Sequence, residues 1–252
     1  MEEKNPIQVA DRLFHVIETL AVTGPMGLLE LSKALDLNKS TVHRVLNSLI
    51  YMGYVKQDAS TSKYSLTYKI CRLANQVLNQ IDLVDIARPY LKELSVKTGE
   101  TVHLVEREEI NAVYIDKVEN SANTVRLVSK VGKSIPLYCS GVGKAMMADM
   151  DEETVRSIWA DSKIEALTEH TITELDTMLR QLELIRKRGY STDDEENELG
   201  VRCVAVSLKD LKGRPKYAIS ISAPGIRMSD ERVEELAERI KETKEKILEA
   251  WK

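Results

Sequence analysis

The 252-residue chain has few of the residues that mark disulfide-rich, metal-binding or membrane-spanning proteins. Its three cysteines, Cys71, Cys139 and Cys203, are widely separated and form no Cys-x-x-Cys pair, so we expect no disulfide framework and a reducing compartment. The four histidines lack metal-ligand spacing. No apolar run approaches the roughly 20 residues that a membrane helix needs. The polar, acidic start is unlike a signal peptide. These absences predict a cytoplasmic protein with no metal, no other cofactor and no membrane contact.

Charge is distributed unevenly along the chain, whose formal net charge is −4. Residues 39–72 carry six basic side chains against one acidic side chain, a net charge of +5. Residues 81–252 carry 27 basic and 33 acidic side chains, a net charge of −6. A basic segment joined to an acidic body predicts that contact with nucleic acid is confined to the basic part.

The spacing of apolar residues in the first part of the chain predicts three helices and a hairpin. The helices are expected over 7–22, over 28–35 and from Lys39 to about Gly53, with Asn38 as the N-cap of the third. Strands are expected over 54–57 and 64–67. This order is typical of a winged helix-turn-helix, which presents its last helix to the DNA major groove.

The polar face of that last helix carries residue types that contact DNA. Arginine can pair with guanine through two hydrogen bonds or contact a phosphate, and both remain open for Arg44. His43 is expected to pack or to lie beside a phosphate rather than to sense pH. The alternative is an ordinary helical hairpin with a solvated polar face, but the basic hairpin that follows favours DNA binding. The predicted DNA-binding residues are Lys39, Ser40, Thr41, His43, Arg44 and Asn47 on the helix, and Lys56 and Lys63 on the hairpin.

The remainder of the chain mixes helices and strands without regular βαβ alternation, which predicts an α+β domain around one sheet. A helical connector is expected over 68–81, then a helix over 82–97 that is broken at Pro89. The charged run 194–198 is expected to be a solvated loop. Strands are expected over 101–105, 112–118, 124–128, 134–137, 190–193, 203–209 and 217–222. Further helices are expected over 142–148, 151–159, 173–188 and 230–250.

Five spaced sequence blocks resemble the IclR family of bacterial transcriptional regulators. They are the winged motif, then Thr98–Val102, Val131–Leu137 leading into Ser140–Ala145, Arg188–Glu196 followed by Gly200–Ala205, and Ala218–Pro224. The resemblance implies a winged helix-turn-helix domain over 1–68, a helical linker over 69–81, and a GAF-like effector-binding domain over 82–252 with a mostly antiparallel sheet. It also implies homodimers or homotetramers on palindromic operators in double-stranded DNA. Their effectors would be small organic acids such as glyoxylate, pyruvate, sugar-derived keto acids or aromatic acids.

The resemblance also assigns an effector pocket, to which Leu127 would add an apolar wall. Ser220 and Ser222 alternate with isoleucines, so both hydroxyls face one side of a strand. Asp193 can accept a hydrogen bond from a ligand hydroxyl, or donate one when burial protonates it. Each serine, and Cys203, is also compatible with an ordinary structural role. The pocket residues implied are Ile135, Gly141, Val142, Asp193, Val201, Cys203, Ser220 and Ser222.

The loop Ser140–Lys144 contains glycines and opens a helix. Backbone N–H groups at a helix start favour an anion such as a carboxylate. The same glycines would also suit a tight packing turn. Lys144 itself is expected to be structural or solvent-facing rather than a ligand anchor.

A thiol-dependent enzyme fused to the DNA-binding module is the alternative function. Cys203 would be its nucleophile, with His103 or His170 as the base. No motif brings these residues together, so no catalytic residue is assigned. An architectural DNA-binding protein without an effector would need a more basic body.

Overall fold

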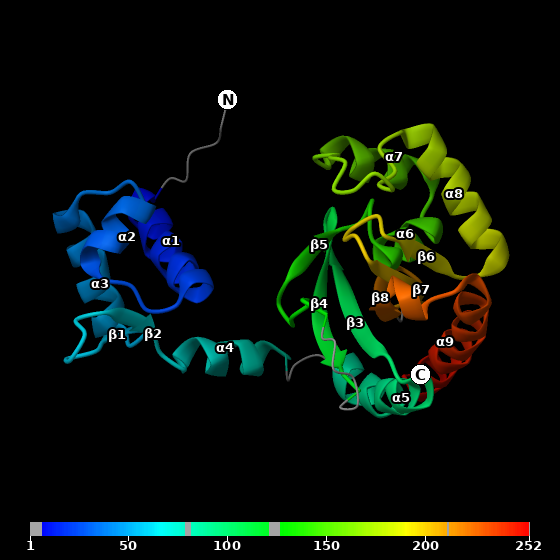
Figure 1. Ribbon diagram of the computed structural model, residues 1–252, viewed down its shortest axis with the longest axis horizontal. Coiled ribbons are helices and arrows are strands. Elements are labelled where there is room, and N and C mark those ends of the chain that lie inside the picture. The colour runs from blue at the N-terminus through cyan, green and yellow to red at the C-terminus, as the bar shows by residue number, and fades with distance from the viewer. Residues whose placement is uncertain (1–6, 79–81, 121–126, 211, 252) are drawn as a thin grey trace. The chain divides into compact units, whose positions relative to one another are not determined.

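The computed structural model describes residues 7–78, 82–120, 127–210 and 212–251. The chain divides into two compact units, Met1–Gln80 and Ile81–Lys252. Figure 1 shows the helices and strands of each unit.

The first unit is a winged helix-turn-helix, as the sequence predicts. Its elements are α1 (Gln8–Thr23), α2 (Leu28–Ala34), α3 (Lys39–Tyr51), β1 (Val55–Gln57) and β2 (Tyr64–Leu66). The two strands pair antiparallel. Apolar residues at helical spacing, among them Leu31, Val42 and Leu46, are fully buried and hold the three helices together. Asn38 occupies the N-cap position of α3, but its side chain makes no capping hydrogen bond.

The wing and the start of the next helix are fixed by local contacts. Asp58 Oδ1 accepts hydrogen bonds from the backbone N–H groups of Ser60 and Thr61, each at 2.9 Å, which closes the turn between β1 and β2. Helix α4 (Lys69–Leu78) follows. Lys69 Nζ donates to the carbonyl oxygen of Met52 at 2.7 Å, and this bond ties the start of α4 to the end of α3.

The second unit is built on one six-stranded sheet. Its strands are β3 (Thr101–Glu108), β4 (Asn111–Val118), β5 (Ser134–Pro136), β6 (Ser191–Asp194), β7 (Val201–Lys209) and β8 (Pro215–Pro224). Their order is β5-β4-β3-β8-β7-β6, and all neighbours are antiparallel. The predicted α+β class with a mostly antiparallel central sheet is confirmed.

Helices cover both faces of this sheet (Figure 1). One face packs against α5 (Asp82–Thr98) and α9 (Asp230–Ala250). The other packs against α6 (Gly141–Ala148), with α7 (Glu152–Asp161) and α8 (Leu175–Arg188) beyond it. Alternation along β8 directs Ile219 and Ile221 to the first face. Ala218 lies on the second face, and Ser220 and Ser222 point the same way.

Three expectations about this unit need correction. Helix α5 continues through Pro89, because the proline is exposed and its helical neighbours Ala87 and Leu91 are buried in the core. Of the strand expected over 124–128, residues 124–126 lie outside the described residues, and Leu127 and Val128 are not in a strand. The charged run after β6 is not wholly solvated, because Glu196 is only 6% exposed.

Candidate functional site

The face of α3 predicted to contact DNA is accessible in the first unit. Seven of the eight predicted residues, including both wing lysines, are exposed, and Thr41 is half-buried. His43 and Asn47 contact each other one turn apart, with Asn47 Nδ2 3.4 Å from His43 Nδ1. The buried residues Val42 and Leu46 anchor the opposite face of the helix. The element can therefore present short polar and basic side chains to a duplex while staying packed on its core.

Two polar residues outside the predicted set, Arg12 and Ser48, belong to this surface. Thr41, Arg44 and Ser48 line a groove between α3 and α1, and Arg12 of α1 lines it as well. Arg12 lies outside the helix-turn-helix motif, so the motif gave no signal for it. Its guanidinium adds positive charge beside Arg44.

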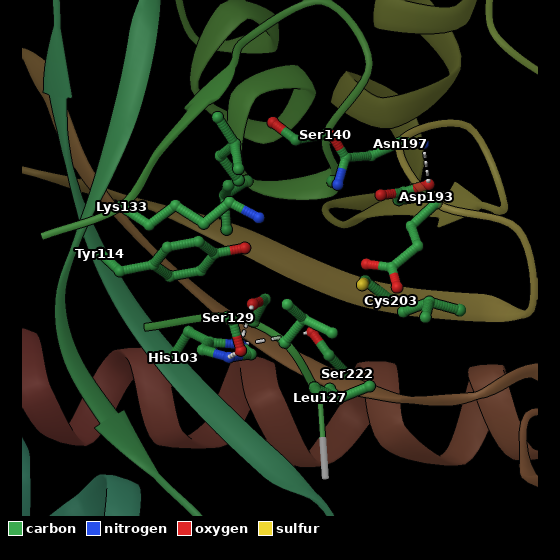
Figure 2. Close-up of a pocket in the computed structure, with 17 residues that line it drawn as sticks. His103, Tyr114, Leu127, Ser129, Lys133, Ser140, Asp193, Asn197, Cys203 and Ser222 are labelled. Atoms are coloured by element: carbon green, nitrogen blue, oxygen red, sulfur yellow. Dashed lines mark hydrogen bonds between the residues drawn. The ribbon is translucent and has the colours of Figure 1, made fainter. Parts of the chain in front are cut away.

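The second unit contains a pocket above the sheet, at the start of α6 (Figure 2). All eight residues predicted for the effector site line it, and Leu127 lines it too. The structure also brings in residues that the sequence did not single out for this site. They are His103, Tyr114, Val128, Ser129, Lys133, Asn197 and Glu198; Ser140, from the loop expected to open a helix, lines the pocket as well.

Strand pairing is the signal that relates His103 to the site. His103 on β3 lies directly beside Ser220 on β8 in the antiparallel register. Once Ser220 is placed in the pocket, its cross-strand neighbour on the same face follows. Figure 2 shows Tyr114 and Lys133 with their polar ends directed into the cavity, across from Asp193 and Asn197.

The start of α6 is held in place by Ser140 and a glycine. Ser140 is the N-cap, and its Oγ accepts from the Gly143 N–H at 3.2 Å and donates to the Pro136 carbonyl at 2.7 Å. A Cβ on Gly143 would lie 2.2 Å from the Leu137 carbonyl oxygen, so only glycine fits this close approach. The first two amides, of Gly141 and Val142, have no acceptor within the helix. They line the pocket and are therefore suited to an anion.

Asp193 lies beside this helix start. An added Cβ on Gly141 would lie 3.5 Å from Asp193 Cβ, an ordinary contact distance. Asp193 Oδ1 accepts from the backbone N–H groups of Glu196 at 2.9 Å and of Asn197 at 3.4 Å. Burial raises the pKa of this carboxyl to about 7, although the nearby Lys144 ammonium opposes the shift. Near neutral pH the group can therefore either donate or accept a hydrogen bond.

Lys144 has a structural position. Its side chain is fully buried and pairs with the Glu196 carboxylate. It does not line the cavity. This agrees with the expectation that Lys144 is not a ligand anchor.

The chemistry of Cys203 does not favour the enzyme alternative. Burial raises the pKa of its thiol far above the usual range, whereas a nucleophilic cysteine needs a lowered pKa. Burial lowers the pKa of His103 to about 3, which makes this imidazole a weak base. His170 is exposed and is not among the residues that line the pocket.

The two units match two family models in the same order. Residues 9–59 match the IclR helix-turn-helix domain, and residues 75–249 match the bacterial transcriptional regulator IclR C-terminal. The chain belongs to the IclR family. It is a DNA-binding transcriptional regulator with a C-terminal effector-binding domain.

Relatives named as regulators match over most of their own length. The HTH-type transcriptional regulator KdgR of Escherichia coli (strain K12) is 37% identical over 235 residues, which cover 92% of this chain and 89% of KdgR. The transcriptional repressor IclR of the same organism is 33% identical over 246 residues, 96% of this chain and 89% of that protein. These relatives are regulators rather than enzymes.

Solved structures of the family agree with the fold. The Thermotoga maritima IclR structure superposes with a TM-score of 0.82 at 31% identity, covering 96% of this chain and 98% of that chain. The C-terminal domain of E. coli KdgR superposes with a TM-score of 0.61 at 34% identity over 68% of this chain and 99% of that chain. Among the described residues of the present chain, no helix is long and apolar enough to cross a membrane.

Proposed function

We propose that this IclR-family regulator senses a small organic acid in the pocket at the start of α6 and changes its affinity for a palindromic operator in response. The observation that carries the proposal is that Ile135, Gly141, Val142, Asp193, Val201, Cys203, Ser220 and Ser222 all line one pocket. The resemblance of the sequence to the family assigns these same eight positions to the effector pocket.

The chemistry of the lining supports a carboxylate-bearing ligand. The amides of Gly141 and Val142 can donate to an anion at the helix start. The hydroxyls of Ser220 and Ser222 lie on the same pocket and add donors. Ile135 and Val201 provide apolar contact for a short carbon skeleton. A small acid would satisfy both kinds of surface.

The DNA-binding residues of two protomers would contact the two halves of a palindromic operator. We propose that Lys39, Ser40, Thr41, His43, Arg44, Asn47, Lys56 and Lys63 contact the duplex, and that dimers or tetramers place two α3 helices in successive major grooves. Half-sites would then be spaced by about one helical turn, ~34 Å, or a multiple of it. The domains would extend over 1–68 and 82–252 with the helical linker 69–81 between them. An acid can shift operator occupancy only if it binds the DNA-competent and DNA-incompetent arrangements with different affinities.

Two assays on the full-length protein test this proposal. A thermal-shift screen of glyoxylate, pyruvate, lactate and gluconate should find at least one acid that raises the melting temperature, because a ligand that binds only the folded state stabilises it. A duplex isolated by in vitro selection should then show altered retention when that acid is added. Substitution of the acid by its neutral amide is the control for the carboxylate.

The two halves of the proposal fail separately. If no acid stabilises the protein, the pocket has been assigned the wrong ligand class. If an acid binds but operator affinity is unchanged at saturation, the pocket is occupied without regulating DNA binding.

A further inference from the structure

His103 lines the pocket and lies between three serine hydroxyls. Its Nε2 lies 2.8 Å from Ser129 Oγ, and its Nδ1 lies 3.4 Å from Ser220 Oγ and 3.3 Å from Ser222 Oγ. Figure 2 shows the imidazole between the Ser129 side and the Ser222 side, joined to them by these contacts. The residue is only 1% exposed, and its ring centroid lies 4.8 Å from that of Tyr114, with the two ring planes tilted by 52°. The imidazole is therefore fixed between Ser129 at Nε2 and the two serines of β8 at Nδ1.

The imidazole is neutral at any physiological pH. Burial lowers its pKa to about 3, and the positive charge of Lys117 lowers it further. A neutral imidazole carries one proton, so one ring nitrogen donates and the other accepts. Its two tautomers therefore impose opposite directions on the hydroxyls around it.

The direction of the hydrogen bonds at Nδ1 affects ligand binding, because Ser220 and Ser222 line the pocket and can donate to a ligand only with hydrogens that the imidazole does not accept. If Nδ1 accepts, one serine hydrogen points down at the ring and is lost to the ligand. If Nδ1 carries the proton, it donates to the serine oxygens, and both hydroxyl hydrogens are available to the cavity. Ser129 then completes the chain by donating its hydroxyl hydrogen to Nε2.

We infer that His103 is a positioning residue for effector recognition: with an organic acid bound, it holds its proton on Nδ1 and so turns Ser220 and Ser222 into donors to the carboxylate. This inference rests on the proposed function and adds a physical reason why the pocket would prefer a carboxylate to its neutral amide. The opposite tautomer would suit a ligand that donates, such as an amide. His103 would therefore discriminate an anion from its neutral analogue through the direction of the Ser220 and Ser222 hydroxyls.

The segment that carries Ser129, the partner of His103 Nε2, is held in place by contacts that do not involve its hydroxyl. Lys117 Nζ donates to the backbone carbonyls of Leu127 at 3.1 Å and Ser129 at 2.7 Å. The same ammonium forms an ion pair with Glu119 at 2.7 Å. The segment 127–129 is thus held across the pocket by backbone contacts. Removing the Ser129 hydroxyl should leave the segment in place while breaking the bond to Nε2.

Nitrogen NMR of the full-length protein tests the tautomer directly. With ¹⁵N-labelled histidine, the chain gives signals from four imidazoles, and the spectrum of His103→Asn assigns the one that disappears. The probe is whichever of glyoxylate, pyruvate, lactate or gluconate stabilises the protein most. At saturation we expect a protonated Nδ1 and an unprotonated Nε2. A protonated Nε2 in the acid-bound protein overturns the inference.

Substitutions provide the second readout, measured by calorimetry with the acid and its amide. Ser129→Ala should weaken acid binding roughly 2- to 12-fold, the range expected for one hydrogen bond. His103→Asn keeps a side-chain N–H donor and should retain the preference for the acid over the amide, whereas His103→Leu should lose it. Ser134→Ala, at an exposed serine outside the pocket lining, is the matched control and should change nothing.

The outcomes separate this inference from the function on which it rests. If no acid in the panel binds wild-type protein, the proposed function fails and the inference fails with it. If an acid binds wild-type, His103→Leu and Ser129→Ala proteins with equal preference over its amide, only the role of His103 is refuted. Should His103→Leu fail to fold, Ser129→Ala and the nitrogen spectrum still decide the question.

Discussion

Lys144 Nζ and the Glu196 carboxylate form an ion pair in which the two side chains are 0% and 8% exposed. The pair joins α6 to the turn after β6, where the Glu196 backbone N–H donates to Asp193 Oδ1. Glu196 Oε2 is buried and has no hydrogen-bond partner within the described part of the chain. The carboxylate therefore depends on Lys144 for most of its compensation.

Removing one member of this pair should cost more stability than removing both. Lys144→Met leaves a buried carboxylate without its counter-charge, and we expect a loss of roughly 3–5 kcal/mol in the free energy of unfolding. The double variant Lys144→Met, Glu196→Gln should recover a substantial part of that loss, because no net charge remains buried. Urea unfolding followed by circular dichroism measures both. Additive losses in the double variant would show that the two side chains do not depend on each other.

Gly143 should tolerate no side chain. Gly143→Ala places a Cβ within 2.2 Å of the Leu137 carbonyl oxygen, a distance that forces the start of α6 away from the preceding turn. We expect destabilisation of about 1–3 kcal/mol, as for other overpacked sites, and weaker acid binding. Gly213→Ala is not a suitable control because its φ is +77°. Gly27→Ala is better, since its nearest contact is a flexible glutamate oxygen at 3.5 Å. Equal stability of the Gly143→Ala and Gly27→Ala proteins would contradict the steric argument.

Arg44 should carry operator recognition without affecting the acid. Arg44→Ala removes an exposed guanidinium from α3, and the loss of one base or phosphate contact per half-site is expected to weaken operator binding by ~1–3 kcal/mol per contact. Gel-shift titrations with the selected duplex and with random duplex, at two salt concentrations, measure this effect. Loss of discrimination indicates a base contact, and a uniform loss with a smaller salt slope indicates a phosphate contact. Unchanged binding to both duplexes would exclude Arg44 from the interface.

Sequence patterns predict the parts of these sites that depend on neighbouring residues, and they do not predict the parts that depend on contacts between distant segments. Helix and strand periodicity located α3 and the wing, because local spacing of residues such as Val42 and Leu46 determines which face is buried. Alternation in β8 placed Ser220 and Ser222 on one side. The sequence does not show which strands pair, so it does not relate His103 to Ser220 and the site.

Local sequence patterns also do not show which charged side chains are buried. Glu196 lies in an acidic run that looks solvated, and its burial follows from Lys144, 52 positions earlier in the chain. The break that the sequence predicts at Pro89 is absent, because α5 continues through it. The tertiary packing of Ala87 and Leu91 outweighs the single hydrogen bond that a proline removes.

Asp193 should make both stability and acid binding depend on pH. Its pKa is raised from 3.8 to about 7 in the folded protein, chiefly by burial. Between these values the unfolded chain has lost the proton and the folded protein has kept it, so the folded state binds more protons and stability falls as pH rises. The contribution is fully present below about pH 4 and is lost as pH passes through about 7. Its upper bound is on the order of 4 kcal/mol, from ~1.4 kcal/mol per pKa unit.

The variant Asp193→Asn isolates this contribution because its amide does not titrate. Urea unfolding of both proteins from pH 4.5 to 8 should give a wild-type free energy that declines relative to the variant. Asp85→Asn, at an exposed carboxylate on α5, is the matched control and should follow wild type. A protonated Asp193 can donate to a bound carboxylate, so wild-type affinity for the acid should also weaken above pH 7, whereas the amide of the variant donates at every pH. Parallel stability curves for wild type and Asp193→Asn would mean that Asp193 is ionised throughout, and the pocket would then reject rather than attract an anion at this position.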